Sequence, residues 1–394
     1  MFLDFSLPSR RPVSTGLAIL VTGALALSGC SSDAKVAKKK VAAPTTTAVP
    51  TPEPFTAMGA PAALAAIIKP LYFGGPVPSS ASAAKVLAGR KPFRAAGPVV
   101  VSAAVAKWKG VPIAVVTSGK DVTFAVAAPT WKVVGGWWPS IAVPEPSLGG
   151  ARRVLVIGSD ARKGQQVDSA RGDSLHIVGL DGHGGGGVLG IARDSYVPLT
   201  TGGRGKINSA LASGGPWGLQ RTVVSATGVP LEGYLITGFD GFERLINGIG
   251  GLPLKAPVAV RDKMSGANIR AGENKLSGRA ALAYGRARHG VAEGDFGRSG
   301  NQGRMIMAAG GFAKLAGPAQ LPGILQVAAP RIGTNMSAEQ VLTFAAGAFA
   351  TNPAKVNNRV AKGGFGWTSD RQSIVLLDAS ARRMFADIRD GNLS

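Results

Sequence analysis

Short runs of apolar residues follow one another between residues 99 and 138, with turn residues between them. The turns fall at Lys109-Gly110 and at residues 118–121, and each contains a glycine. This rhythm predicts a small antiparallel meander, preceded by a short helix near residues 62–68. We therefore expect a β-rich N-terminal domain over residues 58–148. The expected strands are Val99 to Val105, Ile113 to Thr117, Val122 to Ala127 and Val133 to Trp138.

The pattern changes after residue 151, where short apolar strands alternate with helical periodicity. Strands are expected at 154–157, 174–179 and 188–192. Phe239, Phe242, Leu245, Ile246 and Ile249 recur at spacings of three and four, which is typical of a helix with Asp240 as its N-cap. The alternation predicts an α/β domain over residues 151–394, an α-β-α sandwich with a central mixed sheet.

The N-terminus has the pattern of an export signal. Arg10 and Arg11 precede an apolar run, Leu17 to Leu27, that is too short to span a bilayer. The run ends in Leu-Ser-Gly-Cys, a bacterial lipobox that would place a lipid on Cys30. We expect residues 1–30 to be a signal peptide and residues 31–57, rich in Pro, Thr and Lys, to be a tether. An ordinary secretory peptide is the alternative, and export by the general or the twin-arginine route stays open.

Charge narrows the class of partner. The chain has 44 Lys and Arg against 22 Asp and Glu, a formal charge of +22, which favours an anionic partner. Nucleic acid, an anionic membrane and a phosphate-rich substrate all qualify. The sequence shows no helix-turn-helix or zinc pattern, and an export signal argues against nucleic acid. Since Cys30 is the only cysteine, no intramolecular disulfide can form.

Two aspartates lie next to predicted strands. Asp160 follows the first strand of the α/β domain, and Asp173 precedes the second. If these strands pair antiparallel, both carboxylates meet at one end of the sheet. Oxygen ligands of this kind suit Mg²⁺, which needs only one or two carboxylates when phosphate and water complete its coordination. Either aspartate alone is better explained as a turn cap.

A set of basic residues follows in the same domain. Arg193 ends the third strand, and Arg286 and Arg288 share a face if residues 281–289 end as a strand. Arg298 and Gln302 are four apart at the start of a helix that Asp295 opens, where the dipole favours an anion. Several converging guanidinium groups predict a diphosphate ligand.

Six ordered blocks resemble the LytR-CpsA-Psr cell-wall phosphotransferases, and the resemblance runs from Arg152 to about Gly391. The composition, rich in Gly, Ala and Arg, is typical of a GC-rich actinobacterium. The blocks are VLVIGSDAR at 154–162, RGDS at 171–174, ARDSYVPL at 192–199, KINSALASGGP at 206–216, FDGFERLINGIGGL at 239–252, and ALAYGRARH with GDFGR at 281–298.

The resemblance implies an enzyme that moves a phosphoglycan, such as teichoic acid or arabinogalactan, from polyprenyl pyrophosphate to peptidoglycan, with a polyprenyl pyrophosphatase side activity. It places Mg²⁺ at Asp160 and Asp173. It places the pyrophosphate at Arg193, Arg286, Arg288, Arg298 and Gln302. Asn301 stands where the family often has another arginine.

Several assignments stay open at this point. Asp194 and His289 are both candidates for a general base. The apolar stretches Leu219 to Val224 and Leu245 to Leu254 fit either a lipid tunnel or a core. Trp131, Trp137 and Trp138 fit a core better than a sugar-binding surface. A protein that binds the lipid-linked glycan without transferring it is the alternative function.

Overall fold

The computed structural model describes residues 54–92 and 98–394, and these residues form one compact unit. Cys30, the expected signal peptide and most of the expected tether lie outside the described residues. No helix in the described ranges is both long and apolar enough to cross a membrane.

The first sheet contains six strands in sequential order, β1 to β6. Strand β1 pairs parallel to β2, and the remaining neighbours pair antiparallel, so the predicted meander is confirmed. Leu64, Ile68 and Leu71 of helix α1 are buried in a core with the side chains of this sheet. The elements are β1 (Phe55–Met58), α1 (Ala62–Phe73), α2 (Ala81–Leu87), β2 (Val99–Trp108), β3 (Val111–Ser118), β4 (Asp121–Ala127), β5 (Trp131–Trp138), η1 (Pro139–Ile141) and β6 (Val143–Ser147).

Tryptophans of this sheet belong to its core, as expected. Trp138 is fully buried, and its indole Nε1 donates a 2.7 Å hydrogen bond to Thr123 Oγ1. The Trp137 ring lies 5.6 Å from the ring of Phe124. Val115, Phe124 and their neighbours share a buried cluster with helices α7 (Leu321–Ala328) and α8 (Ala338–Ala350). This part of the sheet therefore has little surface left for a sugar.

The central sheet has the order β17-β12-β7-β8-β9-β18 and is mixed. Strand β7 runs parallel to β12 and antiparallel to β8, and β9 runs parallel to β18. The antiparallel pairing of β7 with β8 is the condition under which Asp160 and Asp173 lie at the same end of the sheet. The strands are β7 (Arg152–Ser159), β8 (Gly172–Leu180), β9 (Gly186–Ile191), β12 (Gly233–Thr237), β17 (Gly333–Thr334) and β18 (Val356–Ala361).

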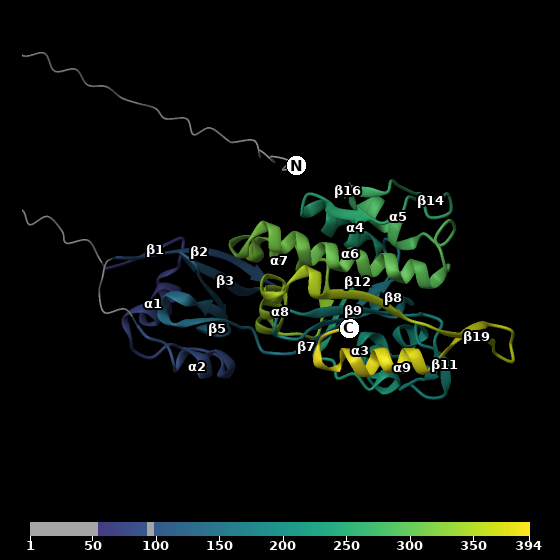
Figure 1. Cartoon of the computed structure of the whole chain (residues 1–394), viewed down its shortest axis with the longest axis horizontal. Coiled ribbons are helices and arrows are strands. Elements are labelled where there is room, and N and C mark those ends of the chain that lie inside the picture. The colour runs from purple at the N-terminus through teal and green to yellow at the C-terminus, as the bar shows by residue number, and fades with distance from the viewer. Residues whose placement is uncertain (1–53, 93–97) are drawn as a thin grey trace, which may run out of the picture. The chain divides into compact units, whose positions relative to one another are not determined.

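Helices cover both faces of the central sheet, which confirms the α-β-α sandwich (Figure 1). Successive side chains of a strand point to opposite faces of the sheet. Leu155, Ile157 and Leu175 pack against α3 (Ser209–Thr227) and α9 (Ala379–Asp387) on one face, and His176 points to α6 (Asp295–Ala316) on the other. Helices α4 (Phe239–Gly248) and α5 (Gly278–Arg286) pack beside α6.

Short hairpins and single turns of 3₁₀ helix complete the fold. Four two-stranded sheets pair β10 (Tyr196–Pro198) with β11 (Arg204–Lys206), β13 (Leu252–Ala256) with β16 (Gly272–Leu276), β14 (Val260–Asp262) with β15 (Ala267–Ile269), and β19 (Gly363–Trp367) with β20 (Ser373–Leu377). The 3₁₀ turns are η2 (Val167–Ser169), η3 (Pro318–Gln320), η4 (Pro353–Lys355) and η5 (Ile388–Asp390).

Two local predictions are wrong. Asp240 does not cap α4: Gly238 is the N-cap, and the Asp240 carboxylate pairs with Arg244 one turn further along, at 3.0 Å. Residues 281–289 do not end as a strand, because α5 continues to Arg286 and ends in an extended C-cap residue, Ala287. The alternation of Arg286 and Arg288 suggests a strand, but the helix-favouring Ala281 and Ala283 pack into a buried cluster and decide the outcome.

Candidate functional site

A cavity of about 470 Å³ opens between the central sheet and helices α4, α5 and α6. One part of its wall is charged and the other is apolar, so its shape and chemistry suit an amphipathic ligand. All seven site residues predicted within the described ranges line it. The charged and polar wall contains Asp160, Arg162, Asp173, Ser174, Arg193, Arg286, Arg288, Arg298 and Gln302, and the apolar wall contains Val156, Leu235, Phe242, Leu245, Ile246, Leu252, Leu282, Met305, Ile306, Ala309 and Ile332.

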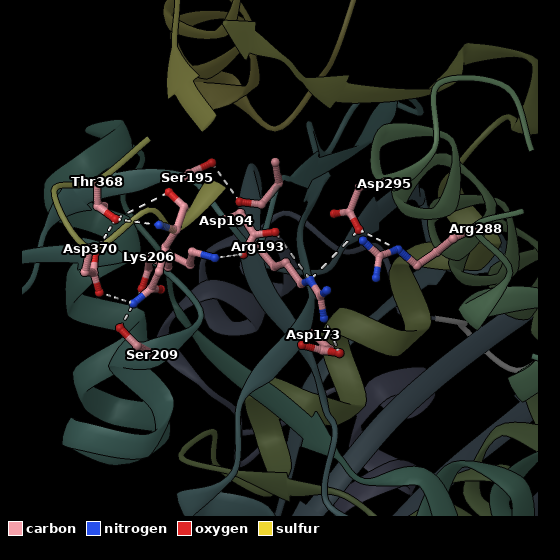
Figure 2. Close-up of polar contacts among 12 residues, drawn as sticks. Asp173, Arg193, Asp194, Ser195, Lys206, Ser209, Arg288, Asp295, Thr368 and Asp370 are labelled. Carbon is pink, nitrogen blue, oxygen red and sulfur yellow. Dashed lines mark hydrogen bonds and ion pairs between the residues drawn. The ribbon is translucent and has the colours of Figure 1, made fainter. Parts of the chain in front are cut away.

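The Asp295 carboxylate lies at the centre of three arginines. Its Oδ1 is 3.0 Å from Arg298 Nη2, 3.3 Å from Arg288 Nε and 3.9 Å from Arg193 Nε. Figure 2 shows the Arg193 and Arg288 side chains converging on it. From the sequence, Asp295 was predicted only to start a helix. Its position three residues before Arg298, which places both side chains on one face of α6, is the signal that was available.

Arg193 connects this cluster to the sheet. It lies two residues after β9, and its Nη1 donates a 2.6 Å hydrogen bond to Asp173 Oδ2. Burial opposes the charged form of Arg193, but the carboxylates of Asp173, Asp295 and Asp194 outweigh it and raise the pKa of the guanidinium. Asp194 in turn pairs with Lys206 at 3.2 Å (Figure 2).

The surroundings of Arg298, unlike those of Arg193, disfavour the charged form of the guanidinium. Its side chain is only 7% exposed, and burial lowers its pKa, with the neighbouring Arg193 and Arg288 adding to the effect against Asp295. An arginine nevertheless stays protonated. The Nε atoms of Arg298 and Arg193 are both buried without a hydrogen-bond partner. Buried donors of this kind need an acceptor, and an anion in the cavity would supply it.

Arg286 and Gln302 line the same cavity from neighbouring helices. The Arg286 guanidinium lies 4.8 Å from the centre of the Phe239 ring, and Gln302 Nε2 donates a 2.8 Å hydrogen bond to the carbonyl of Gly285. The predicted four-residue spacing of Arg298 and Gln302 on α6 does place both at the cavity. Arg286 and Arg288 also share it, although the predicted strand was wrong.

A buried carboxylate fixes the backbone that carries Arg288. Asp262 Oδ2 accepts hydrogen bonds from the amides of Arg288 and His289, at 2.8 and 3.1 Å. Its Oδ1 accepts a third from the amide of Met264. These backbone hydrogen bonds, that of Arg288 first, outweigh burial and lower the pKa of Asp262 to about 2. Asp262 therefore stays ionised and orders the loop between α5 and α6.

The oxygen atoms of Asp160 and Asp173 show whether the predicted Mg²⁺ ligands could hold this ion. Asp160 and Asp173 both line the cavity, and within the described part of the chain no three His, Cys, Asp or Glu side chains gather as a metal-binding group. Asp173 Oδ1 is buried without a hydrogen-bond partner, while Asp160 Oδ1 accepts a 2.8 Å hydrogen bond from the amide of Arg171. The donors fit a cation that receives its remaining ligands from phosphate and water.

Three open assignments can now be compared with the geometry. His289 does not line the cavity, and its ring faces Asp262 at 3.6 Å, whereas Asp194 is paired with Lys206. Leu245 and Leu252 line the cavity, but Leu219 belongs to the core on the opposite face of the sheet. Asn301, the departure from the family pattern, is buried and accepts a hydrogen bond from the Tyr284 hydroxyl at 3.0 Å.

The fold and the site together define a class: an α/β sandwich whose cavity joins an arginine cluster and a carboxylate pair to an apolar wall. The model of the LytR_cpsA_psr family matches residues 139–385, and the chain belongs to that family.

Relatives and solved structures agree with this assignment. The chain is 36% identical to regulatory protein MsrR of Staphylococcus aureus over 149 residues, which is 37% of this chain and 44% of MsrR. It is 36% identical over 166 residues to the polyisoprenyl-teichoic acid–peptidoglycan teichoic acid transferase TagV of Bacillus subtilis, covering 39% of this chain and 42% of TagV. The aligned segments thus span less than half of either relative. The crystal structure of B. subtilis TagV matches with a TM-score of 0.53 and 28% identity, over 61% of this chain and 98% of that one.

Proposed function

We propose that the chain is a Mg²⁺-dependent phosphotransferase that moves a phosphoglycan from a polyprenyl pyrophosphate carrier to peptidoglycan. The observation that carries the proposal is the division of the lining of one cavity between a cationic set of side chains and an apolar set. A polyprenyl pyrophosphate has the same division, with two charged phosphates attached to a long hydrocarbon. The name of the relative TagV, a transferase of teichoic acid to peptidoglycan, supports the same reaction class.

The arginine cluster would bind the pyrophosphate. Arg193, Arg288 and Arg298 all approach the Asp295 carboxylate, and Arg193 also pairs with Asp173. The unpartnered Nε donors of Arg193 and Arg298 leave the cluster ready for phosphate oxygens. Arg286, stacked on Phe239, and Gln302 would contact the pyrophosphate from α5 and α6.

The reaction is one phosphoryl transfer. A hydroxyl oxygen of the acceptor sugar forms a bond with the glycan-side phosphorus, and the bond from that phosphorus to the bridging oxygen breaks. Polyprenyl phosphate leaves, and the hydroxyl proton passes to water. The arginines stabilise the charge that grows on the leaving phosphate, which is the main catalytic contribution expected in reactions of this kind.

Asp160 and Asp173 would hold Mg²⁺ at the edge of this cluster. The ion would supply charge neutralisation of the phosphate oxygens when it is bound. Asp173 uses one oxygen for Arg193 and has the other unpartnered, so it can connect the cation to the arginine cluster. Water acting as acceptor in place of a sugar would give the pyrophosphatase side activity.

The proposed location is the outer face of the cell membrane. The lipobox at Cys30 supports a lipid anchor, and the basic residues Lys38, Lys39 and Lys40 of the expected tether follow it. Labelling with a radioactive fatty acid tests this, because the wild-type protein should be labelled and remain with membranes, whereas Cys30→Ala should not be labelled.

Turnover separates the enzyme from the alternative, a binder of lipid-linked glycan. Purified protein is incubated with Mg²⁺ and a synthetic polyprenyl-pyrophosphate-linked sugar, and polyprenyl phosphate is followed by mass spectrometry. The enzyme should release it with repeated turnover, faster when peptidoglycan is added. Tight binding of the substrate with no release would favour the binder.

A further inference from the structure

The β19–β20 hairpin displays two large aromatic side chains on one face. Phe365 and Trp367 are 73% and 72% exposed and lie two residues apart on β19, so they point to the same side. Glycines occupy the alternate positions, Gly364 and Gly366. Exposed aromatic side chains in a row are unusual on a protein surface and mark an interaction site.

The hairpin is attached to both segments that supply the arginine cluster. The amide of Val375, the cross-strand partner of Phe365, donates a 2.9 Å hydrogen bond to the carbonyl of Asp194, which follows Arg193. Lys362 Nζ pairs at 2.6 Å with Glu293, just before α6.

The aromatic face starts at the first turn of α6, the helix that carries Asp295 and Arg298. The Phe365 ring lies 5.8 Å from the ring of Phe296, the residue after Asp295. Val375, on the same face as Phe365, is buried against Phe296 and Ala192. Trp367 is one step further from this contact, towards the tip of the hairpin. The row Phe296, Phe365, Trp367 therefore leads away from the site that the arginines form.

The chemistry of the hairpin favours a sugar chain over a lipid surface. A hairpin that inserts into a bilayer has apolar residues at its tip, but here the tip residues 368–372 are Thr-Ser-Asp-Arg-Gln. Asp370 accepts hydrogen bonds from Thr368 and Gln372, so the tip is polar and ordered, and Figure 2 shows it on the Lys206 side of the arginine cluster. Sugar rings have apolar faces that stack on aromatic rings and hydroxyl edges that bind polar groups.

We propose that Phe365 and Trp367 form a docking face for the acceptor, a polysaccharide strand of the cell wall, which this face guides to the arginine cluster. The acceptor role rests on the proposed transferase function, but binding to the polysaccharide can be measured without any reaction.

The experiment is sedimentation of the purified protein with peptidoglycan sacculi, in the absence of any lipid-linked substrate. Trp367→Ala should weaken binding about tenfold, the scale set by the loss of one aromatic contact, and Phe365→Ala/Trp367→Ala should weaken it further. Trp367→Tyr keeps a ring and should bind nearly as well as the wild type. The matched control is Trp217→Ala, which removes another exposed tryptophan (56%) from α3 and should have no effect.

A second measurement needs no variant. Hydrogen exchange of residues 363–377 in the wild-type protein should slow when soluble glycan strands are added. Unchanged exchange, or wild-type sedimentation by Trp367→Ala, would overturn the proposal. The proposal would also be overturned if binding to phosphatidylglycerol vesicles depended on Trp367 and binding to sacculi did not. If sacculi bind through Trp367 but the wild type releases no polyprenyl phosphate, the docking face stands and the transferase function falls.

Discussion

Asp173 holds Arg193 through one carboxylate oxygen, at 2.6 Å, and leaves the other oxygen buried without a hydrogen-bond partner. One residue thus orients the cation that connects the cluster to the sheet and offers a ligand to a metal ion. The arginines and the proposed metal position are therefore parts of one arrangement, and changes at either should affect the same reaction.

Arg193→Lys should keep the positive charge but lose the fork of donors that reaches both Asp173 and a phosphate. We expect kcat/KM for release of polyprenyl phosphate to fall roughly 100- to 1,000-fold, as when one transition-state donor is removed. The melting temperature should change little, since Lys can still pair with Asp173. Arg204→Ala, which removes a nearby arginine that stacks on Tyr196 and does not line the cavity, is the matched control. Full activity of Arg193→Lys would remove the arginine from the mechanism.

Asp173→Asn should raise the Mg²⁺ concentration needed for half-maximal activity by roughly 10- to 100-fold, the effect expected when a metal site loses a ligand or its support. Chelation with EDTA should abolish activity in the wild type, and added Mg²⁺ should restore it. Activity titrated against Mg²⁺ measures both. Asp168→Asn, at an exposed aspartate close by in sequence, should titrate like the wild type. A wild-type Mg²⁺ titration for Asp173→Asn would refute the assignment of this ligand.

Ala309→Phe should fill part of the apolar wall, because Ala309 lines the cavity from α6. The substitution should raise KM for a long polyprenyl substrate about tenfold and affect a short-chain analogue much less. Leu315→Phe on the same helix, where the side chain is 86% exposed, provides the control. Equal effects on both chain lengths would show that the hydrocarbon lies elsewhere.

His176 should make stability depend on pH between about 6.5 and 4. Burial is the main cause that lowers its pKa from 6.5 to about 4 in the folded state, against the hydrogen bond to the Ser299 carbonyl. The unfolded chain therefore takes up a proton first, so this contribution is complete above pH 6.5 and is lost progressively as pH falls to about 4. The loss should reach about 3 kcal/mol.

Urea unfolding from pH 7.5 to 4.5 measures this dependence. His176→Gln cannot titrate and should show a shallower loss of unfolding free energy with falling pH, whatever its stability at pH 7.5. His183→Gln changes an exposed histidine and should follow the wild type. Parallel curves for wild type and His176→Gln would contradict the assignment.

The sequence predicted the layers of the fold well because burial leaves a strong periodic signal. The strands of the meander and β7, β8 and β9 were found, with ends that differ by a few residues. Residues 281–289 were misassigned because a two-residue spacing of arginines fits a strand as well as the end of a helix. Only the packing of α5 against α4 and α6 separates these cases.

The candidate site was predicted more completely than its internal contacts. All the expected residues from Asp160 to Gln302 line one cavity. Asp295 was missed as a member of the cluster: its three-residue spacing from Arg298 was a weak signal in the sequence, and its contacts with Arg193 and Arg288 are tertiary. The Phe365 and Trp367 face was missed for a similar reason: exposure is a property of the fold, and the aromatic residues of β5 looked equally suitable in sequence.

The most direct test of the account is mass spectrometry of the lipid that purifies with the protein from membranes. We expect a polyprenyl phosphate or pyrophosphate in the wild-type protein. Its amount should be strongly reduced in Arg298→Gln, which removes a charge from the cluster, and in Ala309→Phe, which fills the apolar wall. A wild-type protein that carries ordinary diacyl phospholipid in that cavity, or none of these lipids even after incubation with polyprenyl pyrophosphate, would contradict it.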